Sequence, residues 1–172
     1  LRAGAGRDVD ILGVSNDSRH VHVGDLFICK GYGFKPEYLL MAQCAGAVCY
    51  MAEEKYDACP LPALVISDVR KAQSLAARWF YDCPSDSLDL IGVTGTKGKT
   101  TTAYMIQAIT NAIAGRPTGL SSSAGRYCGG PDVDTHLTTP ESLDLQWLFA
   151  QARDHGLHYM TAEVSSQAYQ VE

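Results

Sequence analysis

The chain has 172 residues, of which 46% are hydrophobic and 19% charged, and its formal net charge is -5. This length suits one large domain or two small ones with a hydrophobic core, and the composition excludes an intrinsically disordered chain. No run of lysine or arginine is present in the sequence, which argues against a surface for DNA or RNA.

The ends of the sequence, its apolar stretches and its cysteines indicate the cellular compartment of the protein. The chain starts at Leu1 and ends at Glu172, so we expect that either end is a fragment boundary. The first ten residues lack the apolar core of a signal peptide, and the longest apolar stretch, residues 38–52, is too short to span a bilayer. The six cysteines form no CxxC pair, and several lie in apolar runs, which indicates reduced, buried thiols. We therefore predict a cytoplasmic protein.

The first half of the chain alternates short apolar runs with helical patterns. We predict strands at residues 9–14, 26–29, 47–51 and 63–66, and helices at residues 37–45 and 69–81. In the second of these helices, Ala72, Leu75, Ala76 and Trp79 are expected on the buried face, and Asp68 is expected to cap the N-terminus.

The segment CPSDS at residues 83–87 is the best candidate for a linker between two domains. We place the domains at residues 1–86 and 87–172. In the second half we predict strands at 88–93, 118–120 and 159–164, helices at 100–114 and 141–154, and a loop or loose hairpin at 121–134. Leu143, Trp147, Leu148 and Ala150 are expected on the buried face of the last helix. The β-α-β alternation predicts an α/β fold with a parallel sheet in each half.

The most informative segment is GTKGKTTT, which follows the apolar strand at residues 88–93 and opens a helix. Gly95 and Gly98 allow the backbone to turn sharply, so that loop N–H groups and the helix N-terminus face an anion. Lys99 can reach the β- and γ-phosphates, and the Thr100 hydroxyl can bind Mg²⁺. The spacing G-x-x-G-K-T differs from the standard phosphate loop, and an ordinary glycine-rich turn is the alternative. The strand-loop-helix context nevertheless favours a nucleotide-binding site.

Four sequence blocks together resemble the Mur ligase family. GTKGKTTT, HLTTPES and AEVSSQA are similar to three blocks of the family's central domain. DSRHVHVGDLFICKG is similar to the N-terminal, UDP-MurNAc-binding domain of the MurE type. The resemblance spans nearly the whole chain and implies a small α/β UDP-binding domain followed by part of an ATP-binding domain.

The resemblance implies an ATP-dependent amide ligase of peptidoglycan precursor synthesis. ATP would phosphorylate the D-Glu carboxylate of UDP-MurNAc-L-Ala-D-Glu, and the amine of a diamino acid would attack the resulting acyl phosphate. The expected cofactors are ATP and Mg²⁺, and the expected partners are this nucleotide sugar and a diamino acid, with no nucleic acid and no membrane.

The resemblance also assigns roles to single residues. Lys99 and Glu163 are expected to be catalytic, and Thr100 and Glu163 to bind the metal. Seven residues match the ATP-binding loop: Gly95, Thr96, Lys97, Gly98, Lys99, Thr100 and Thr101. Five residues match substrate-binding positions: Asn16, Ser18, Thr138, Thr139 and Ser165.

Each of these roles has a structural alternative. Glu163 could be a solvated carboxylate at a strand end, although the carboxyl ends of parallel strands are where α/β sites assemble. Thr138 and Thr139 could cap the helix that follows Pro140, and residues 15–19 (SNDSR) could be a tight turn. Three departures from the family pattern are Lys97 and Leu137, where many members have asparagine, and Gln167, where many have histidine.

Two further signals are weaker. In the KGYGF segment at residues 30–34, Tyr32 or Phe34 could stack on the uracil base, although a core or rim position is the commoner fate of an aromatic residue. The pairs His20/His22 and His155/His158 are expected to be structural or exposed rather than metal ligands.

The alternatives are a Mur-like ligase of another type, such as the MurF type, a folate-polyglutamate ligase, a generic phosphate-loop kinase or GTPase, and a non-catalytic nucleotide-sugar-binding fragment. The DSRHVHVGDLF block argues against the folate type, and the lack of an N-K-x-D motif argues against a GTPase. In the family, a carbamylated lysine and a C-terminal domain that selects the amino acid lie beyond the region matched here. We therefore expect the 172-residue chain alone to be inactive in ligation and only marginally soluble.

Overall fold

The computed structural model describes residues 9–31, 33–130 and 141–165. The chain divides into two compact units, Leu1–Phe80 and Tyr81–Glu172. The division falls shortly before the CPSDS segment, at which the sequence analysis placed the domain boundary. Residues Pro84–Ser87 of that segment form a short 3-10 helix, η1, which belongs to the second unit.

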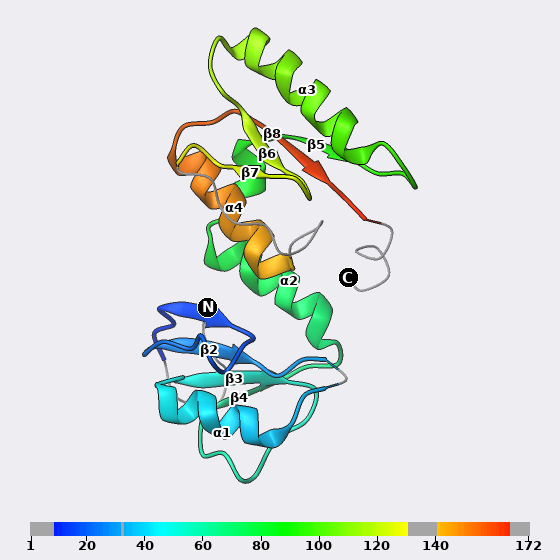
Figure 1. The fold of residues 1–172 in the computed structure, drawn as a ribbon. Coiled ribbons are helices and arrows are strands. Elements are labelled where there is room, and N and C mark those ends of the chain that lie inside the picture. Colours follow the sequence, from blue (N-terminus) through cyan, green and yellow to red (C-terminus); the bar gives the residue numbers. More distant parts are fainter. Residues whose placement is uncertain (1–8, 32, 131–140, 166–172) are drawn as a thin grey trace. The chain divides into compact units, whose positions relative to one another are not determined.

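The first unit contains a four-stranded parallel sheet (Figure 1). Its strands lie in the order β1-β2-β3-β4, and each neighbouring pair is parallel. Their bounds are β1 Gly13–Ser15, β2 Asp25–Ile28, β3 Cys49–Ala52 and β4 Ala63–Val65, and the two helices of the unit are α1 Pro36–Ala45 and α2 Val69–Phe80. The first strand is shorter than predicted and starts later.

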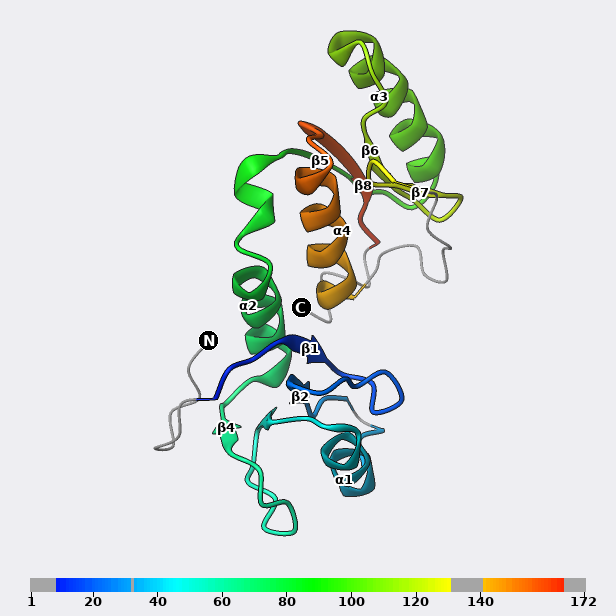
Figure 2. The same cartoon turned by 90° about the vertical axis from the view of Figure 1, so that its left-hand side faces the viewer.

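The two helices cover opposite faces of this sheet, as both views show (Figures 1 and 2). All residues of β2 and β3 are buried, which is typical of parallel strands that are covered on both faces. Phe27 and Tyr50 pack with Leu39 and Ala42 of α1 in the main apolar cluster of the unit. The carboxyl ends of the four strands therefore meet at one edge of a well-packed unit.

The buried face of α2 differs from the predicted one. Ala76 is buried as expected, but Leu75 and Trp79 are 41% and 59% exposed. The buried positions are instead Val69, Gln73, Ala76 and Ala77. Small side chains allow a helix to approach a sheet closely, whereas the prediction favoured the largest apolar side chains. Asp68 does cap the helix, because its Oδ1 atom accepts a hydrogen bond from the Lys71 N–H at 3.0 Å.

The second unit contains a mixed four-stranded sheet in the order β5-β8-β6-β7. The β5-β8 and β8-β6 pairs are parallel, and β6-β7 is an antiparallel hairpin. The bounds are β5 Asp89–Val93, α3 Lys99–Ala114, β6 Gly119–Ser121, β7 Arg126–Tyr127, α4 Ser142–Asp154 and β8 Tyr159–Glu163. The predicted parallel sheet is confirmed in its three-stranded part, and β7 adds an antiparallel edge.

Helices α3 and α4 lie on opposite faces of this sheet (Figures 1 and 2). On the α3 side, Val93 and Leu120 pack against Ala103. On the α4 side, Met160 packs against Leu148 and other residues of the larger cluster. Strand β8, last in the sequence, thus lies between β5 and β6 and brings its final residue, Glu163, opposite Val93 at the end of β5.

Two predictions about buried side chains, one for α4 and one for the cysteines of both units, are only partly correct. Leu143, Leu148 and Ala150 are buried in α4 as expected, but Trp147 is 37% exposed. Among the cysteines, Cys44 is exposed and Cys83 is partly exposed, while the other four are buried and all six are free thiols. Within the described residues, no helix is both long enough and apolar enough to cross a membrane.

Candidate functional site

The loop at residues 94–98 joins β5 to α3 and is exposed to solvent. Gly95 and Gly98 both have positive φ angles, of 150° and 80°. Residues with a side chain rarely adopt this backbone conformation, so the turn explains why glycine occupies both positions. The predicted glycine loop therefore has the backbone geometry that its sequence indicates.

Gly98 is the N-cap of α3, and no side chain caps this helix end. The Thr102 N–H donates to the Gly98 carbonyl oxygen at 2.9 Å, which closes the first helical turn. The N–H groups that precede it in the turn have no intrahelical acceptor, and the helix dipole adds positive potential at the same place. This end of a 16-residue helix is suited to bind an anionic group.

The Lys99 side chain folds back over the loop. Its Nζ atom donates a hydrogen bond of 2.8 Å to the carbonyl oxygen of Gly95. The ammonium group is thus held directly above the turn, where it can neutralise a phosphate that the loop N–H groups bind. Thr96 and Lys97 lie in the exposed turn, and Thr101 lies exposed in the first turn of α3.

Glu163 is the last residue of β8 and is only 1% exposed. It pairs with Val93, the last residue of β5, so its carboxylate enters the region just past the strand that leads into the loop. The N–H of Ser123 donates to Glu163 Oε1 at 3.2 Å. Burying a carboxylate is costly unless it is hydrogen bonded, which argues against the alternative of a solvated strand-end residue.

The hydroxyl of Thr100 lies 3.2 Å from the hydroxyl of Ser123. Ser123 therefore contacts both Thr100 and Glu163, the two predicted metal ligands. Their hydroxyl and carboxylate oxygens are the donors that Mg²⁺ prefers, and a Mg²⁺ site commonly uses only one or two protein ligands together with phosphate and water. The described residues contain no group of three or more histidine, cysteine, aspartate or glutamate side chains that could hold a metal. The residues present thus fit a nucleotide-dependent Mg²⁺ site and not a metal cage made of protein alone.

Three further residues of this unit were predicted to bind substrate. Ser165 lies two residues after Glu163 beyond the end of β8 and is partly buried. Thr138 and Thr139 lie outside the described residues, so their substrate role stays a prediction.

The sequence analysis missed Ser123. It treated residues 121–134 as a loop or loose hairpin and assigned no role to the three serines. A usable signal was present, because Ser121–Ser123 directly follow a predicted strand of a parallel sheet, at the edge where the phosphate loop also lies.

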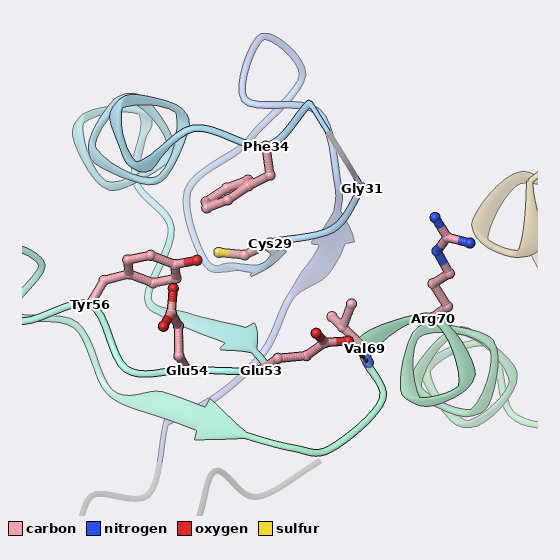
Figure 3. A pocket seen from close by; sticks show the side chains of 8 residues that line it. All are labelled: Cys29, Gly31, Phe34, Glu53, Glu54, Tyr56, Val69 and Arg70. Atoms are coloured by element: carbon pink, nitrogen blue, oxygen red, sulfur yellow. Dashed lines mark hydrogen bonds between the residues drawn. The ribbon is translucent and has the colours of Figure 1, made fainter.

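The first unit has its own pocket, of about 440 Å³, at the carboxyl ends of its parallel strands (Figure 3). Cys29 and Gly31 follow β2, Glu53 and Glu54 follow β3, and Phe34 covers one side. Among the described residues, the lining consists of Cys29, Gly31, Phe34, Glu53, Glu54, Tyr56, Val69 and Arg70.

Aromatic and charged groups define the chemistry of this pocket. The rings of Phe34 and Tyr56 lie 5.6 Å apart, and the Tyr56 N–H donates to the Tyr50 hydroxyl at 2.9 Å. Burial and then the charge of Glu54 raise the pKa of Tyr56, and burial raises the pKa of Cys29 to about 12. Both groups are therefore neutral near pH 7.

The Glu53 carboxylate has a structural role at the pocket wall. Its Oε1 atom accepts a hydrogen bond of 3.2 Å from the N–H of Val69, the first residue of α2 (Figure 3). The helix N-terminus is thus already occupied by an acidic side chain. Glu53, Glu54, Tyr56 and Arg70 were not predicted, although the two glutamates directly follow a predicted strand.

Asn16 and Ser18 follow β1 at the same edge of the sheet. The Asn16 amide donates to Gln73 Oε1 of α2 at 3.5 Å, and Ser18 lies partly buried in the turn after the strand. Asp17, between them, forms a salt bridge of 2.7 Å with Arg19, whose guanidinium holds the pKa of Asp17 well below its usual range. The predicted tight turn is present, and neither Asn16 nor Ser18 lines the pocket.

The predicted histidine pairs do not form a metal site within the described residues. His155 Nδ1 lies 2.7 Å from the Gln151 carbonyl oxygen at the end of α4. His20 and His22 lie near the carboxylates of Asp17 and Asp25 at 3.5 and 3.9 Å.

Comparison with known proteins finds relatives of one family. Residues 93–171 match the family model described as the Mur ligase middle domain. The chain is 45% identical over 170 residues to a UDP-N-acetylmuramyl-tripeptide synthetase of Bifidobacterium longum. The aligned region covers 98% of this chain and 33% of that protein. It is 47% identical over 160 residues to the protein of the same name from Lactobacillus delbrueckii subsp. bulgaricus, covering 91% and 31%.

Solved structures share the fold. The structure of a UDP-N-acetylmuramoyl-L-alanyl-D-glutamate--2,6-diaminopimelate ligase superposes with a TM-score of 0.78 and 24% identity, over 99% of this chain and 35% of that one. The MurF ligase of Thermotoga maritima in complex with ADP superposes with a TM-score of 0.58 and 20% identity, over 93% and 33%.

The chain spans about a third of the length of the curated relatives it matches. The middle-domain match begins at the last residue of β5 and takes in the glycine loop, Ser123 and Glu163. With its glycine loop between β5 and α3, its α/β fold and its similarity to these synthetases over nearly its whole length, the chain belongs to the Mur ligase family.

Proposed function

We propose that the full-length protein carrying these residues is an ATP-dependent amide ligase of peptidoglycan precursor synthesis. In this proposal it joins a diamino acid to the D-Glu carboxylate of UDP-MurNAc-L-Ala-D-Glu through an acyl phosphate. The names of the relatives, at 45–47% identity over at least 91% of the chain, support this substrate class.

The observation that carries the proposal is the contact of Ser123 with both Thr100 and Glu163 beside the glycine loop. A hydroxyl and a carboxylate, from the first turn of α3 and the end of β8, converge on one hairpin residue at the carboxyl edge of the sheet. A protein that only binds a nucleotide sugar has no need of this arrangement. We therefore favour the ligase over the non-catalytic alternative.

The chemistry follows from the residues of the loop. The loop N–H groups and the α3 N-terminus bind the phosphates of ATP, and the Lys99 ammonium neutralises negative charge on the transferred phosphoryl group. Thr100 and Glu163 would hold Mg²⁺, which supplies further charge neutralisation on the phosphate oxygens when it is bound. The acceptor carboxylate attacks the γ-phosphorus, ADP leaves, and attack by the amine on the acyl carbon then releases phosphate.

We assign nucleotide-sugar recognition to the first unit. The pocket beside Phe34 and Tyr56 offers an aromatic wall for a planar base, and Asn16 and Ser18 offer polar groups at the same sheet edge. Thr138, Thr139 and Ser165 are proposed to contact the muramoyl-peptide part of the substrate. Six free cysteines suit a reducing compartment, and we propose the cytoplasm as the site of the reaction.

Phosphate release by the full-length protein tests the proposal. The assay contains ATP, Mg²⁺ and UDP-MurNAc-L-Ala-D-Glu, with a panel of amino acids that includes meso-diaminopimelate and lysine. We expect release that requires both the nucleotide sugar and one diamino acid. Release that does not depend on the nucleotide sugar would contradict the ligase assignment and favour a nucleotide hydrolase.

A further inference from the structure

Ser123 lies at the tip of the β6-β7 hairpin and contacts two elements of the site. Its backbone N–H donates to Glu163 Oε1 at 3.2 Å, and its hydroxyl lies 3.2 Å from the Thr100 hydroxyl. One residue thus joins the end of β8 to the first turn of α3. No role for this residue follows from the sequence motifs, since it lies outside GTKGKTTT and AEVSSQA.

The hairpin that carries Ser123 has its own hydrogen bonds. The Ser122 N–H donates to the Gly125 carbonyl oxygen at 3.0 Å, and the Ser122 hydroxyl oxygen accepts from the Ala124 N–H at 3.1 Å. Ser121 pairs with Arg126 at the base of the turn. Because the main-chain contacts of Ser121 and Ser122 hold the backbone before Ser123, the position of its N–H is set independently of the glycine loop.

The contact with Ser123 offers the threonine proton an acceptor. A hydroxyl oxygen that turns a lone pair toward a cation must direct its O–H bond elsewhere, and that bond needs an acceptor. The Ser123 hydroxyl oxygen, at 3.2 Å, is such an acceptor. With Thr100 as the donor, the hydroxyl contact favours the rotamer and proton orientation in which Thr100 can serve as a ligand.

The contact with Glu163 acts on the other donor. A backbone N–H on Oε1 fixes the plane of a carboxylate that is only 1% exposed. This contribution comes from the main chain, so it survives replacement of the Ser123 side chain.

We propose that Ser123 is a positioning residue of the Mg²⁺–ATP site, which orients the Thr100 hydroxyl through its side chain and the Glu163 carboxylate through its N–H. This inference rests on the proposed function, because it concerns the metal site of the same reaction. It divides the role of one residue into a side-chain part, which mutation removes, and a backbone part, which mutation leaves in place.

The test is the Mg²⁺ dependence of ATP binding by the full-length protein, measured by calorimetry at a series of Mg²⁺ concentrations. Removing a group that orients a metal ligand commonly costs 10- to 100-fold in metal affinity. Because Ser123→Ala keeps the N–H, we expect the Mg²⁺ concentration required for half-maximal tight binding to rise by about 10-fold. ATP binding measured without Mg²⁺ should be unchanged, and Ser123→Thr, which keeps a hydroxyl, should restore the normal Mg²⁺ requirement.

Two controls separate positioning from folding. Ser122→Ala removes a neighbouring hydroxyl that accepts from the Ala124 N–H within the hairpin, and it keeps the main-chain bonds of Ser121 and Ser122 that hold the turn, so it should leave the Mg²⁺ requirement unchanged. In a Thr100→Val background, Ser123→Ala should have little further effect, because the side chain acts through the Thr100 hydroxyl. Thermal unfolding of every variant checks that each one is folded, and Ser123→Gly replaces Ser123→Ala if the alanine variant is not.

Several results would overturn the inference. These are an unchanged Mg²⁺ requirement in Ser123→Ala, an equal loss of ATP binding with and without Mg²⁺, the same shift in Ser122→Ala, or full additivity with Thr100→Val. Failure of the proposed function looks different, because the wild-type protein would then release phosphate without requiring the nucleotide sugar, whatever the Mg²⁺ requirement of its ATP binding.

Discussion

Both units place their candidate site at the carboxyl ends of their parallel strands, but the two sites are built from different groups. In the second unit, two glycines and the start of α3 form the loop, so the backbone itself supplies most of the anion-binding groups. In the first unit, side chains that follow several strands and side chains of α2 line the pocket, and Gly31 is the one glycine among the described lining residues. The comparison shows that a local backbone site is encoded in a short motif, whereas a side-chain pocket is encoded across the fold.

The largest expected effect concerns the charge above the glycine loop. Lys99→Met removes the ammonium group that lies on Gly95, and we expect phosphate release to fall by roughly 10²- to 10³-fold, the usual cost of losing one electrostatic contact to the transition state. Lys97→Met, in the same exposed turn, should lose far less, because we expect Lys97 to contribute only through its backbone N–H, which the variant keeps. Equal losses in the two variants would mean that only the net charge of the loop matters.

The pocket of the first unit should respond to loss of an aromatic side chain. Phe34→Leu removes a ring that faces Tyr56, and stacking on a base is worth about 1–3 kcal/mol. We expect the affinity for the nucleotide sugar, measured by calorimetry, to fall by about 10-fold while ATP affinity is unchanged. Tyr38→Leu serves as the control, because Tyr38 packs on the edge of Phe34 but does not line the pocket. A comparable loss in both variants would indicate a packing effect rather than a base contact.

The two glycines at the ends of α3 test whether the backbone conformation of the glycine loop matters for ATP binding. Gly98 and Gly115 lie at the two ends of α3 with φ angles of 80° and 66°, and a Cβ atom at either position would meet no other atom within 4 Å. Alanine at either site should therefore lower the free energy of unfolding by about 1–2 kcal/mol through backbone strain alone. Only Gly98→Ala should also weaken ATP binding. If Gly115→Ala weakened ATP binding equally, the loop would have no special role.

The smallest expected effect is a pH dependence that arises in the first unit. Burial raises the pKa of Cys29 to about 12 from an ordinary value of 9.0, so the folded state keeps the proton while the unfolded state releases it. The stabilising contribution is complete below pH 9 and is lost as the pH rises from about 9 toward 12. Urea unfolding at pH 7 to 10 should show this decline, and Cys29→Ala should make it shallower. An unchanged slope in the variant would assign the decline to other groups, such as Cys49, whose pKa burial also raises to about 11.

Local signals in the sequence were sufficient for most of the fold. Gly98 and Gly115 bound α3, Asp68 caps α2, and the apolar runs give the parallel strands within a few residues. Helix faces were predicted less well, because Leu75, Trp79 and Trp147 are large and apolar but exposed. Which face of a helix is buried depends on the neighbour that it meets, and a single helix pattern does not contain that information.

Residues of the candidate sites were likewise predicted only where a local motif marks them. Lys99, Thr100 and Glu163 were predicted from motifs, and the structure gathers them at one edge of the sheet. Ser123 and the pocket residues Glu53 and Tyr56 were not predicted, because their roles depend on strand order. Strand β8 lies between β5 and β6, and that order brings Glu163 beside the hairpin.

The most direct test of the proposed chemistry follows one oxygen atom. The full-length protein is given ATP, Mg²⁺, a diamino acid and UDP-MurNAc-L-Ala-D-Glu labelled with oxygen-18 in the D-Glu carboxylate that reacts. If this carboxylate attacks the γ-phosphorus, one labelled oxygen passes into each phosphate released, and mass spectrometry of the phosphate will detect it. Unlabelled phosphate would show that water attacks ATP, and the ligase mechanism would then be wrong.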